Sequence, residues 1–274
     1  MRPLLGILAL MTVASCGAQP SAPARYTASM TVLEGGGHGP QLCNVVMESN
    51  PPQCEGPDVV GLDWGKVAHE SLNGVKWGRY RLVGTWDGTR LTLTEPPGEP
   101  VEEPDKGDRF ASPCPEPEGG WRPADPARAT EQTMKDALAR ARSAQDYAGS
   151  WLDRFTPEPE HPEEQMEMDA HNYVLNLRFT GDLAARESWI REVWGGALCL
   201  SGAERTEAEL RAVQRDLEDE LGKQGAEIIS VGADELANLV RVSAWVATDE
   251  LRQRLEDEHG ADVISLEGVL KPVG

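Results

Sequence analysis

The stretch TEAELRAVQRDLEDELGKQGAEIISVGADELANLVRVSAWVA, residues 206–247, contains the clearest signals for the fold. Thr206 and Glu209 have the spacing of a capping box, which marks the start of a helix. The apolar residues that follow repeat at helical spacing and predict a helix of about four turns: Leu210, Val213, Leu217 and Leu221. Two alternating segments, 227–231 and 239–247, then predict a β-hairpin around residues 232–238.

The elements on either side of this stretch complete an ordered series. Residues 197–200 and 263–270 are typical of strands, and Thr248 is a good N-cap for a helix between them. The order from Ala197 is therefore β-α-β-β-α-β, that of a ferredoxin-like domain with one antiparallel sheet beneath two helices. A strand at 173–179 and a helix capped by Asp182 precede it. We assign residues 171–274 to this ferredoxin-like α+β domain.

Two segments without an apolar period separate this domain from the rest of the chain. Residues 96–125 are rich in proline and acidic residues and predict an extended linker, with Cys114 as its tether. A second, acidic linker covers residues 156–170 and begins TPEPEHPEEQ. Between them, the cap Asp125, Pro126 in the first turn and apolar residues at near-helical spacing predict a helix over 126–155.

Residues 26–95 predict a small β domain. In RYRLVGTWDGTRLTLTE, residues 79–95, two alternating runs flank Asp87-Gly88, which predicts a hairpin. Strand signals at 26–33, 42–47 and 59–62 bring the count to about five strands, which suits a small barrel of OB type. The fold class is thus α+β: a small N-terminal β domain, a linking helix and a C-terminal ferredoxin-like domain. 

The β domain contains three tryptophans, Trp64, Trp77 and Trp86, which allow two interpretations. Indole rings offer flat apolar area and one donor, so they could form a stacking or sugar-binding face. The alternative is that they fill or rim a small core, and we favour it.

The first residues, MRPLLGILALMTVASCGAQP, predict export. One basic residue, Arg2, precedes an apolar run that is shorter than the roughly 20 residues needed to span a bilayer. Val13-Ala14-Ser15-Cys16 resembles the lipobox of bacterial lipoproteins. The resemblance implies a signal peptide over 1–15, a diacylglyceryl group on the sulfur of Cys16, and a tether over 16–25. The alternative is an ordinary secretory signal cut near Ala18.

This resemblance also implies a location. A multi-chain lipid anchor at Cys16 would hold the protein stably on a membrane. We expect the protein in the cell envelope, at the outer face of the plasma membrane or, if the cell has one, in the outer membrane.

Four cysteines remain after Cys16, and an even count in an exported chain predicts two disulfides. Their spacing does not match a zinc site. Four cysteines allow three pairings. We prefer Cys43 with Cys54, because they close a short loop within one β domain, which leaves Cys114 with Cys199.

The charge balance bears on the partners. The chain has 46 acidic and 26 Lys and Arg residues, a net charge of −20 that becomes −21 when Arg2 leaves with the signal peptide. Nucleic-acid binding requires clustered cations, so we expect no nucleic-acid partner. Beyond the membrane, reached through Cys16, we expect another envelope protein as partner. The overall charge favours a basic one.

The C-terminal region has a further resemblance. In SGAERTEAELRAVQRDLEDELGKQGAEIISVGADELANLVRVSA, residues 201–244, a helix of form AELxxxQxxL precedes a hairpin of form IxSVGxDxxxNxVxV. This resembles α+β modules of actinobacterial exported proteins, including pro-regions of serine proteases that assist folding. The resemblance implies a module that contacts other proteins. We expect no protease domain after Gly274, and we carry over no catalytic residue.

Sequence motifs for chemistry are absent. The chain has no GxSxG, GxxxxGK[ST] or HExxH sequence, and we assign no catalytic residue, metal ligand or cofactor. One cluster of suitable residue types could hold zinc or copper: His161, Glu163, Glu164, Met166, Met168, Asp169 and His171. We favour an acidic linker there, because the neighbouring prolines leave the ligands unfixed. Two functions remain: a non-enzymatic binding or scaffolding lipoprotein, which we favour, and an envelope hydrolase with a site between domains.

Overall fold

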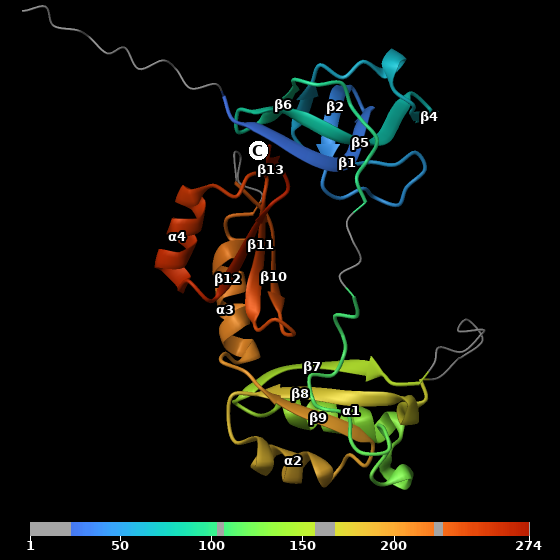
Figure 1. Cartoon of the computed structure of the whole chain (residues 1–274), viewed down its shortest axis with the longest axis vertical. Helices are drawn as coiled ribbons and strands as arrows, with labels where there is room; N and C mark the ends of the chain where they lie inside the picture. Colours follow the sequence, from blue (N-terminus) through green and yellow to red (C-terminus); the bar gives the residue numbers. More distant parts are fainter. Residues whose placement is uncertain (1–22, 103–106, 157–167, 222–226, 274) are drawn as a thin grey trace, which may run out of the picture.

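The computed structural model describes residues 23–102, 107–156, 168–221 and 227–273 (Figure 1). The protein is mixed α+β, as the sequence predicts, with its described strands in three sheets. The sheet of the N-terminal domain lies at one end and a three-stranded unit at the other, with a second three-stranded unit between them. None of the described helices is long and apolar enough to cross a membrane.

The N-terminal domain is a sheet that closes on itself. Its strands are β1 (Arg25–Gly35), β2 (His38–Cys43), β3 (Asp58–Val60), β4 (Glu70–Leu72), β5 (Val75–Trp86) and β6 (Arg90–Leu93), with a short 3-10 helix, η1 (Trp64–Lys66). Because β1 pairs with both β2 and β5, the pairings run β1-β2-β3-β6-β5 and back to β1. This five-membered ring agrees with the expected small barrel. The predicted hairpin joins β5 to β6, with Gly88 at φ 99°.

Residues from the far end of the described chain complete this barrel. Strand β13 (Lys271–Pro272) pairs with β1 through Tyr26 and Pro272. Leu270 is 1% exposed and belongs to the apolar core of the barrel. The indoles of Trp86 and Trp245 lie with ring centroids 6.0 Å apart. The barrel therefore packs directly on the middle unit.

The first three-stranded unit consists of α1 (Glu131–Arg142), β7 (Tyr147–Arg154), β8 (Tyr173–Phe179), α2 (Leu183–Arg191) and β9 (Ala197–Gly202), with 3-10 turns η2 (Pro126–Arg128) and η4 (Ala170–Asn172). The prediction of one helix over 126–155 is wrong at both ends. Asp125 caps the short 3-10 turn η2, and α1 begins only at Glu131, with Thr130 as its N-cap. The helix ends at Arg142, and Tyr147–Arg154 pairs with β8 instead. Gly149 has a φ of 153°, which a helix would not accommodate. The residues of this segment therefore point to alternating faces of β7 instead of lying on one side of a helix.

The second unit consists of α3 (Glu207–Glu218), β10 (Ile228–Asp234), β11 (Leu239–Ala244), α4 (Asp249–His259) and β12 (Ile264–Gly268). The capping box of Thr206 and Glu209 is confirmed, as are the caps Asp182 and Thr248. The predicted elements are present, but they do not form the single antiparallel sheet of a ferredoxin-like domain. Strand β9 pairs with β8 in the first unit, and β11 pairs with β12 in parallel.

The two units are structural repeats of each other, each with the order α-β-β-α-β. In each, an antiparallel hairpin is followed by a crossover helix and a parallel third strand. The crossovers match in length: Leu175 pairs with Leu198, 23 residues on, and Val240 pairs with Ile264, 24 residues on. This repeat explains why β9 leaves the expected sheet, because it is the third strand of the first copy.

The irregularities of the two hairpins also correspond. In the first unit the register shifts after the pair Tyr147 and Phe179, and in the second after the pair Ile228 and Ala244. All four residues are buried in the core between the sheet and its helices. A bulge at the same place in both hairpins supports the description of the two units as repeats.

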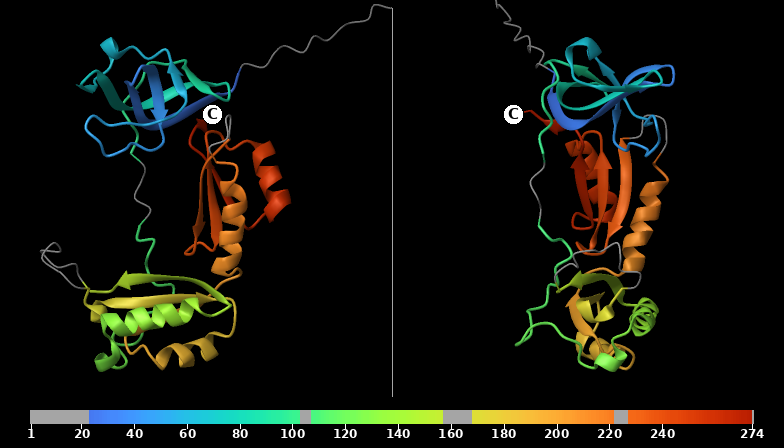
Figure 2. Two further views of the ribbon diagram at one scale, coloured as in Figure 1. Left: turned by 180° about the vertical axis from the view of Figure 1, so that it is seen from behind. Right: turned by 90° about the vertical axis from the view of Figure 1, so that its right-hand side faces the viewer.

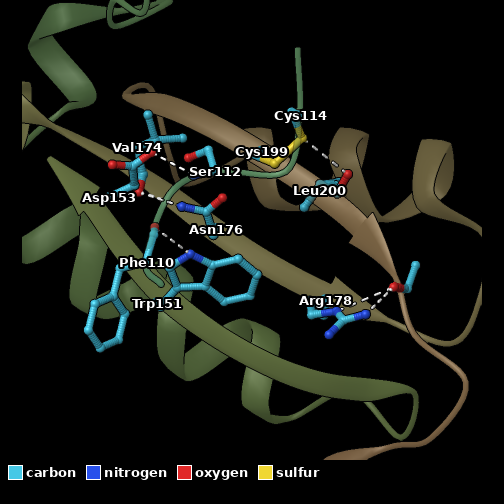
Figure 3. The surroundings of a disulfide bond; sticks show 11 residues. Phe110, Ser112, Cys114, Trp151, Asp153, Val174, Asn176, Arg178, Cys199 and Leu200 are labelled. Atoms are coloured by element: carbon cyan, nitrogen blue, oxygen red, sulfur yellow. Dashed lines mark hydrogen bonds between the residues drawn. A yellow bond between two sulfur atoms is a disulfide. The ribbon is translucent and has the colours of Figure 1, made fainter. Parts of the chain in front are cut away.

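The Pro-rich linker joins the barrel to the first unit and runs past the second unit on its way (Figures 1 and 2). At its far end it lies on the face of the β7-β8-β9 sheet that is turned away from the helices (Figure 3). The amide of Ser112 donates to Asp153 at 2.7 Å, and the indole of Trp151 donates to the Phe110 carbonyl at 3.0 Å. The linker is thus an extended segment bound along a sheet face.

Candidate functional site

Both predicted disulfides are present. Cys43 bonds Cys54 within the barrel, and Cys114 bonds Cys199 between the linker and β9. Cys16, the predicted lipidation site, lies outside the described residues. Disulfides of this kind are typical of proteins outside the cytoplasm.

The candidate metal cluster is only partly within the described residues, since His161, Glu163, Glu164 and Met166 lie outside them. Of the others, Asp169 accepts hydrogen bonds from the His171 amide at 3.0 Å and the His171 imidazole at 2.8 Å. These two bonds lower the pKa of Asp169. Asp169 therefore caps the turn η4. Across the described ranges, no three His, Cys, Asp or Glu side chains are grouped to hold a metal ion.

The three tryptophans of the barrel do not share one surface. Trp64 is buried in the barrel core and donates to Glu34 at 2.7 Å. Trp77 packs beside the Cys43–Cys54 disulfide, and Trp86 packs against Trp245 of the second unit. The interpretation that they fill or rim a core is the one their positions support.

A different set of residues forms a hollow where the barrel meets the second unit. We call it the junction hollow; its volume is about 530 Å³. Its walls come from β1 and β5 of the barrel, the end of β12 with the chain after it, and Val101 of the linker. The amide of Val101 donates to Ser29 Oγ at 2.9 Å, which fixes the linker at the rim.

Three cations line the junction hollow: Arg79, Arg81 and Lys271. Arg79 and Arg81 alternate with buried Tyr80 and Leu82, so their side chains project outward from the surface of the barrel. Within the described part of the chain, none of the three is in an ion pair or a side-chain hydrogen bond. Among the described residues, Glu267 is the one acidic residue of the lining.

Some arginines of the described chain bind carboxylates, as Arg25 binds Glu95, Arg186 binds Asp146 and Arg254 binds Glu220. Others are also in no ion pair, but the junction hollow differs because three such cations line one cavity. Uncompensated cations that converge on one hollow repel each other, and an anion placed between them relieves that repulsion. The junction hollow is therefore suited to bind an anionic group.

A second hollow of about 500 Å³ lies farther along the same sheet and shares Ser243 with the first. Its central group is Asp234, whose side chain is 5% exposed and contacts Arg241 at 2.5 Å and Arg109 at 3.3 Å. Burial by itself would raise the pKa of Asp234. The amide of Ala237 and the two guanidinium groups outweigh burial and lower the pKa below its ordinary value.

Sequence reasoning did not identify the junction hollow. The alternation Arg79-Tyr80-Arg81-Leu82 does place both arginines on the outer face of a strand, and this signal is present in the sequence. Nothing in the sequence brings Lys271 to them across some 190 residues, because that requires the pairing of β13 with β1.

No known protein family matches this sequence, and no curated protein is significantly similar to it. The site must therefore be interpreted by its own chemistry. Cations, hydroxyls and a partly apolar wall can hold an anionic ligand.

Proposed function

We propose that this protein is a lipid-anchored binding protein of the bacterial cell envelope, and that the junction hollow binds an anionic group of its partner. The anchor is the one implied by the lipobox resemblance at Cys16. The two disulfides support an extracytoplasmic location. The observation that carries the binding role is the set of unpaired cations, Arg79, Arg81 and Lys271, in a chain of net charge −20.

The chemistry of the hollow suits a carboxylate or a phosphate group. Guanidinium groups bind either through two parallel hydrogen bonds, and Lys271 adds a point charge. The net charge of −20 favours a basic partner at long range, as expected from the sequence, but that field is screened over about 8 Å at physiological ionic strength. At contact distance the three cations of the junction hollow therefore determine which group binds there.

The hydrolase alternative predicts perturbed carboxylates that converge in one cleft. Asp234 and Glu235 are the nearest approach to such a pair, because the pKa of Asp234 is lowered while burial raises the pKa of Glu235. Both line the second hollow, but their side chains have separate partners. Asp234 contacts Arg109 and Arg241, whereas Glu235 accepts from the Ser150 amide at 3.2 Å and lies 3.5 Å from Arg211 on α3.

The binding proposal can be tested with a small polycarboxylate. Tricarballylate should bind the protein from residue 17 onward, detected by isothermal titration calorimetry and by a rise in melting temperature. The double variant Arg79→Gln/Arg81→Gln should lose this binding, because it removes two of the three cations.

The matched control is Arg215→Gln/Arg252→Gln, which removes two exposed arginines of α3 and α4 that face neither hollow. It changes the net charge equally and should bind tricarballylate as the unaltered protein does. Equal loss in both double variants would show that only total charge matters. Absence of binding to the unaltered protein would overturn the proposal.

A further inference from the structure

We propose that the partner group is part of an extended acidic polypeptide segment, which docks along the outer face of the β10-β11-β12 sheet. We call this surface the open face: Ser230, Gly232, Arg241, Ser243, Ser265 and Glu267, which alternate with the residues packed under α3 and α4. The inference rests on the proposed anion-binding role of the junction hollow and names the class of ligand.

The first argument is internal to the molecule. In the first unit, the equivalent sheet face already carries an extended segment, namely the linker. The linker lies across Val174, Cys199 and Asp153, and its own Cys114 packs among them. Because the two units are repeats, the chain itself shows that this face of the fold accepts an extended polypeptide.

The correspondence extends to single positions. Asp153 stands opposite Val174 in the first hairpin, and Asp234 stands opposite Leu239 in the second. The linker contacts both aspartates, through the Ser112 amide in one unit and through Arg109 in the other. Thus the described residues of the linker bind the first face directly and contact the second through Arg109.

The second argument is that the open face is accessible. Ser230, Arg241 and Glu267 are exposed, and Ser243 is half-buried between the two hollows that it joins. Two corresponding positions of the first unit are covered: Asn176, equivalent to Arg241, and Cys199, equivalent to half-buried Ser265, are each 1% exposed. A surface that is covered in one repeat and accessible in the other is a place for an external segment.

The third argument selects an acidic occupant. The junction hollow offers three unpaired cations at the barrel end of the face. At the other end Arg241 and Arg109 share one carboxylate, Asp234, and Glu235, which lies 3.5 Å from Arg211, also lines that hollow. The strand β11 between them has six residues, which corresponds to about 20 Å of extended chain. A segment with carboxylates spaced over that length meets cations at both ends.

The test compares a labelled peptide of alternating Glu and Ser, about twelve residues and so about 40 Å long, with tricarballylate. Fluorescence anisotropy should show the peptide binding about tenfold more tightly, because it meets additional contacts beyond the junction hollow. Ser230→Glu adds a negative charge on the open face outside the junction hollow. It should weaken peptide binding about fivefold and leave tricarballylate binding unchanged. Ser71→Glu, on exposed β4, is the matched control and should change neither.

The outcomes separate the two proposals. If tricarballylate binds but the peptide binds no more tightly and Ser230→Glu has no effect, the docking inference is overturned while the junction hollow remains an anion site. If neither probe binds, both proposals fail. An inorganic polyphosphate that binds as tightly as the peptide, without sensitivity to Ser230→Glu, would assign the site to a phosphate polymer and overturn the polypeptide inference.

Discussion

Removing the disulfide between Cys114 and Cys199 should destabilise the protein more than removing the one between Cys43 and Cys54. The first closes a separation of 85 residues and the second a separation of 11. The loop-entropy relation at 25 °C gives stabilisations of about 4.6 and about 2.8 kcal/mol for those separations. The double variant Cys114→Ser/Cys199→Ser should therefore lose about 1.8 kcal/mol more than Cys43→Ser/Cys54→Ser.

The structure adds a local consequence to this difference. Cys114 holds the linker on the first unit, where the indole of Trp151 donates to the Phe110 carbonyl and Trp121 packs beside Cys199. Without the disulfide these contacts remain but lose their covalent tether. Hydrogen exchange should increase in the linker around Ser112 before it increases in the strands β7 and β8.

The assay is urea unfolding followed by tryptophan fluorescence and by circular dichroism, which also reports whether the three sheets unfold together. The oxidised protein and the two double variants are compared at the same pH and ionic strength. A loss of stability in Cys43→Ser/Cys54→Ser that equals or exceeds the loss in Cys114→Ser/Cys199→Ser would refute the reasoning from loop length. It would mean that the barrel depends on its disulfide for more than chain entropy.

Three further predictions concern other regions. Cys16→Ser should abolish lipid attachment and release the protein from the membrane fraction or leave its signal peptide uncleaved; unchanged detergent-phase partitioning would contradict the lipobox assignment. Asp234→Asn should cost about 2 kcal/mol in thermal or urea unfolding, because Arg109 and Arg241 lose a buried anionic partner. The folded-state pKa of Asp234 lies below its ordinary 3.8, so this contribution to stability is present above pH 3.8 and disappears as the pH falls through the folded-state value. If the stability of Asp234→Asn falls with decreasing pH in the same way as that of the unaltered protein, the reasoning is wrong. Thr206→Ala removes one side of the capping box of α3 and should cost about 1 kcal/mol, restored in part by Thr206→Ser and not by Thr206→Val.

Local signals in the sequence predicted local structure well. The caps Thr206, Asp182 and Thr248 start helices as expected, and Asp87-Gly88 forms its hairpin. These features depend on residues a few positions apart, so the sequence alone carries them.

The errors have a common origin in long-range pairing. The segment after Arg142 has apolar residues that fit a helical period, but Tyr147–Arg154 becomes a strand because β8 offers a partner, and β8 begins 19 residues after β7 ends. Tertiary context outweighs propensity there. The assignment of β9 to the second unit failed similarly, since the order of elements does not say which sheet a strand joins. The junction hollow likewise depends on long-range pairing, because β13 brings Lys271 to the barrel by pairing with β1.

The contribution of residues 270–272 to the barrel also constrains the order in which the protein folds. Tyr26 pairs with Pro272, and the buried side chain of Leu270 fills the core that β1 and β5 enclose. Contacts over so large a sequence separation form slowly, because the intervening chain must first be brought together. A chain that is synthesised N-terminus first therefore has a barrel with part of its apolar interior uncovered until the second αββαβ unit is present. During that interval the barrel is open to aggregation and proteolysis, and we expect substitutions at Leu270 to reduce the amount of mature protein more than its final stability would suggest.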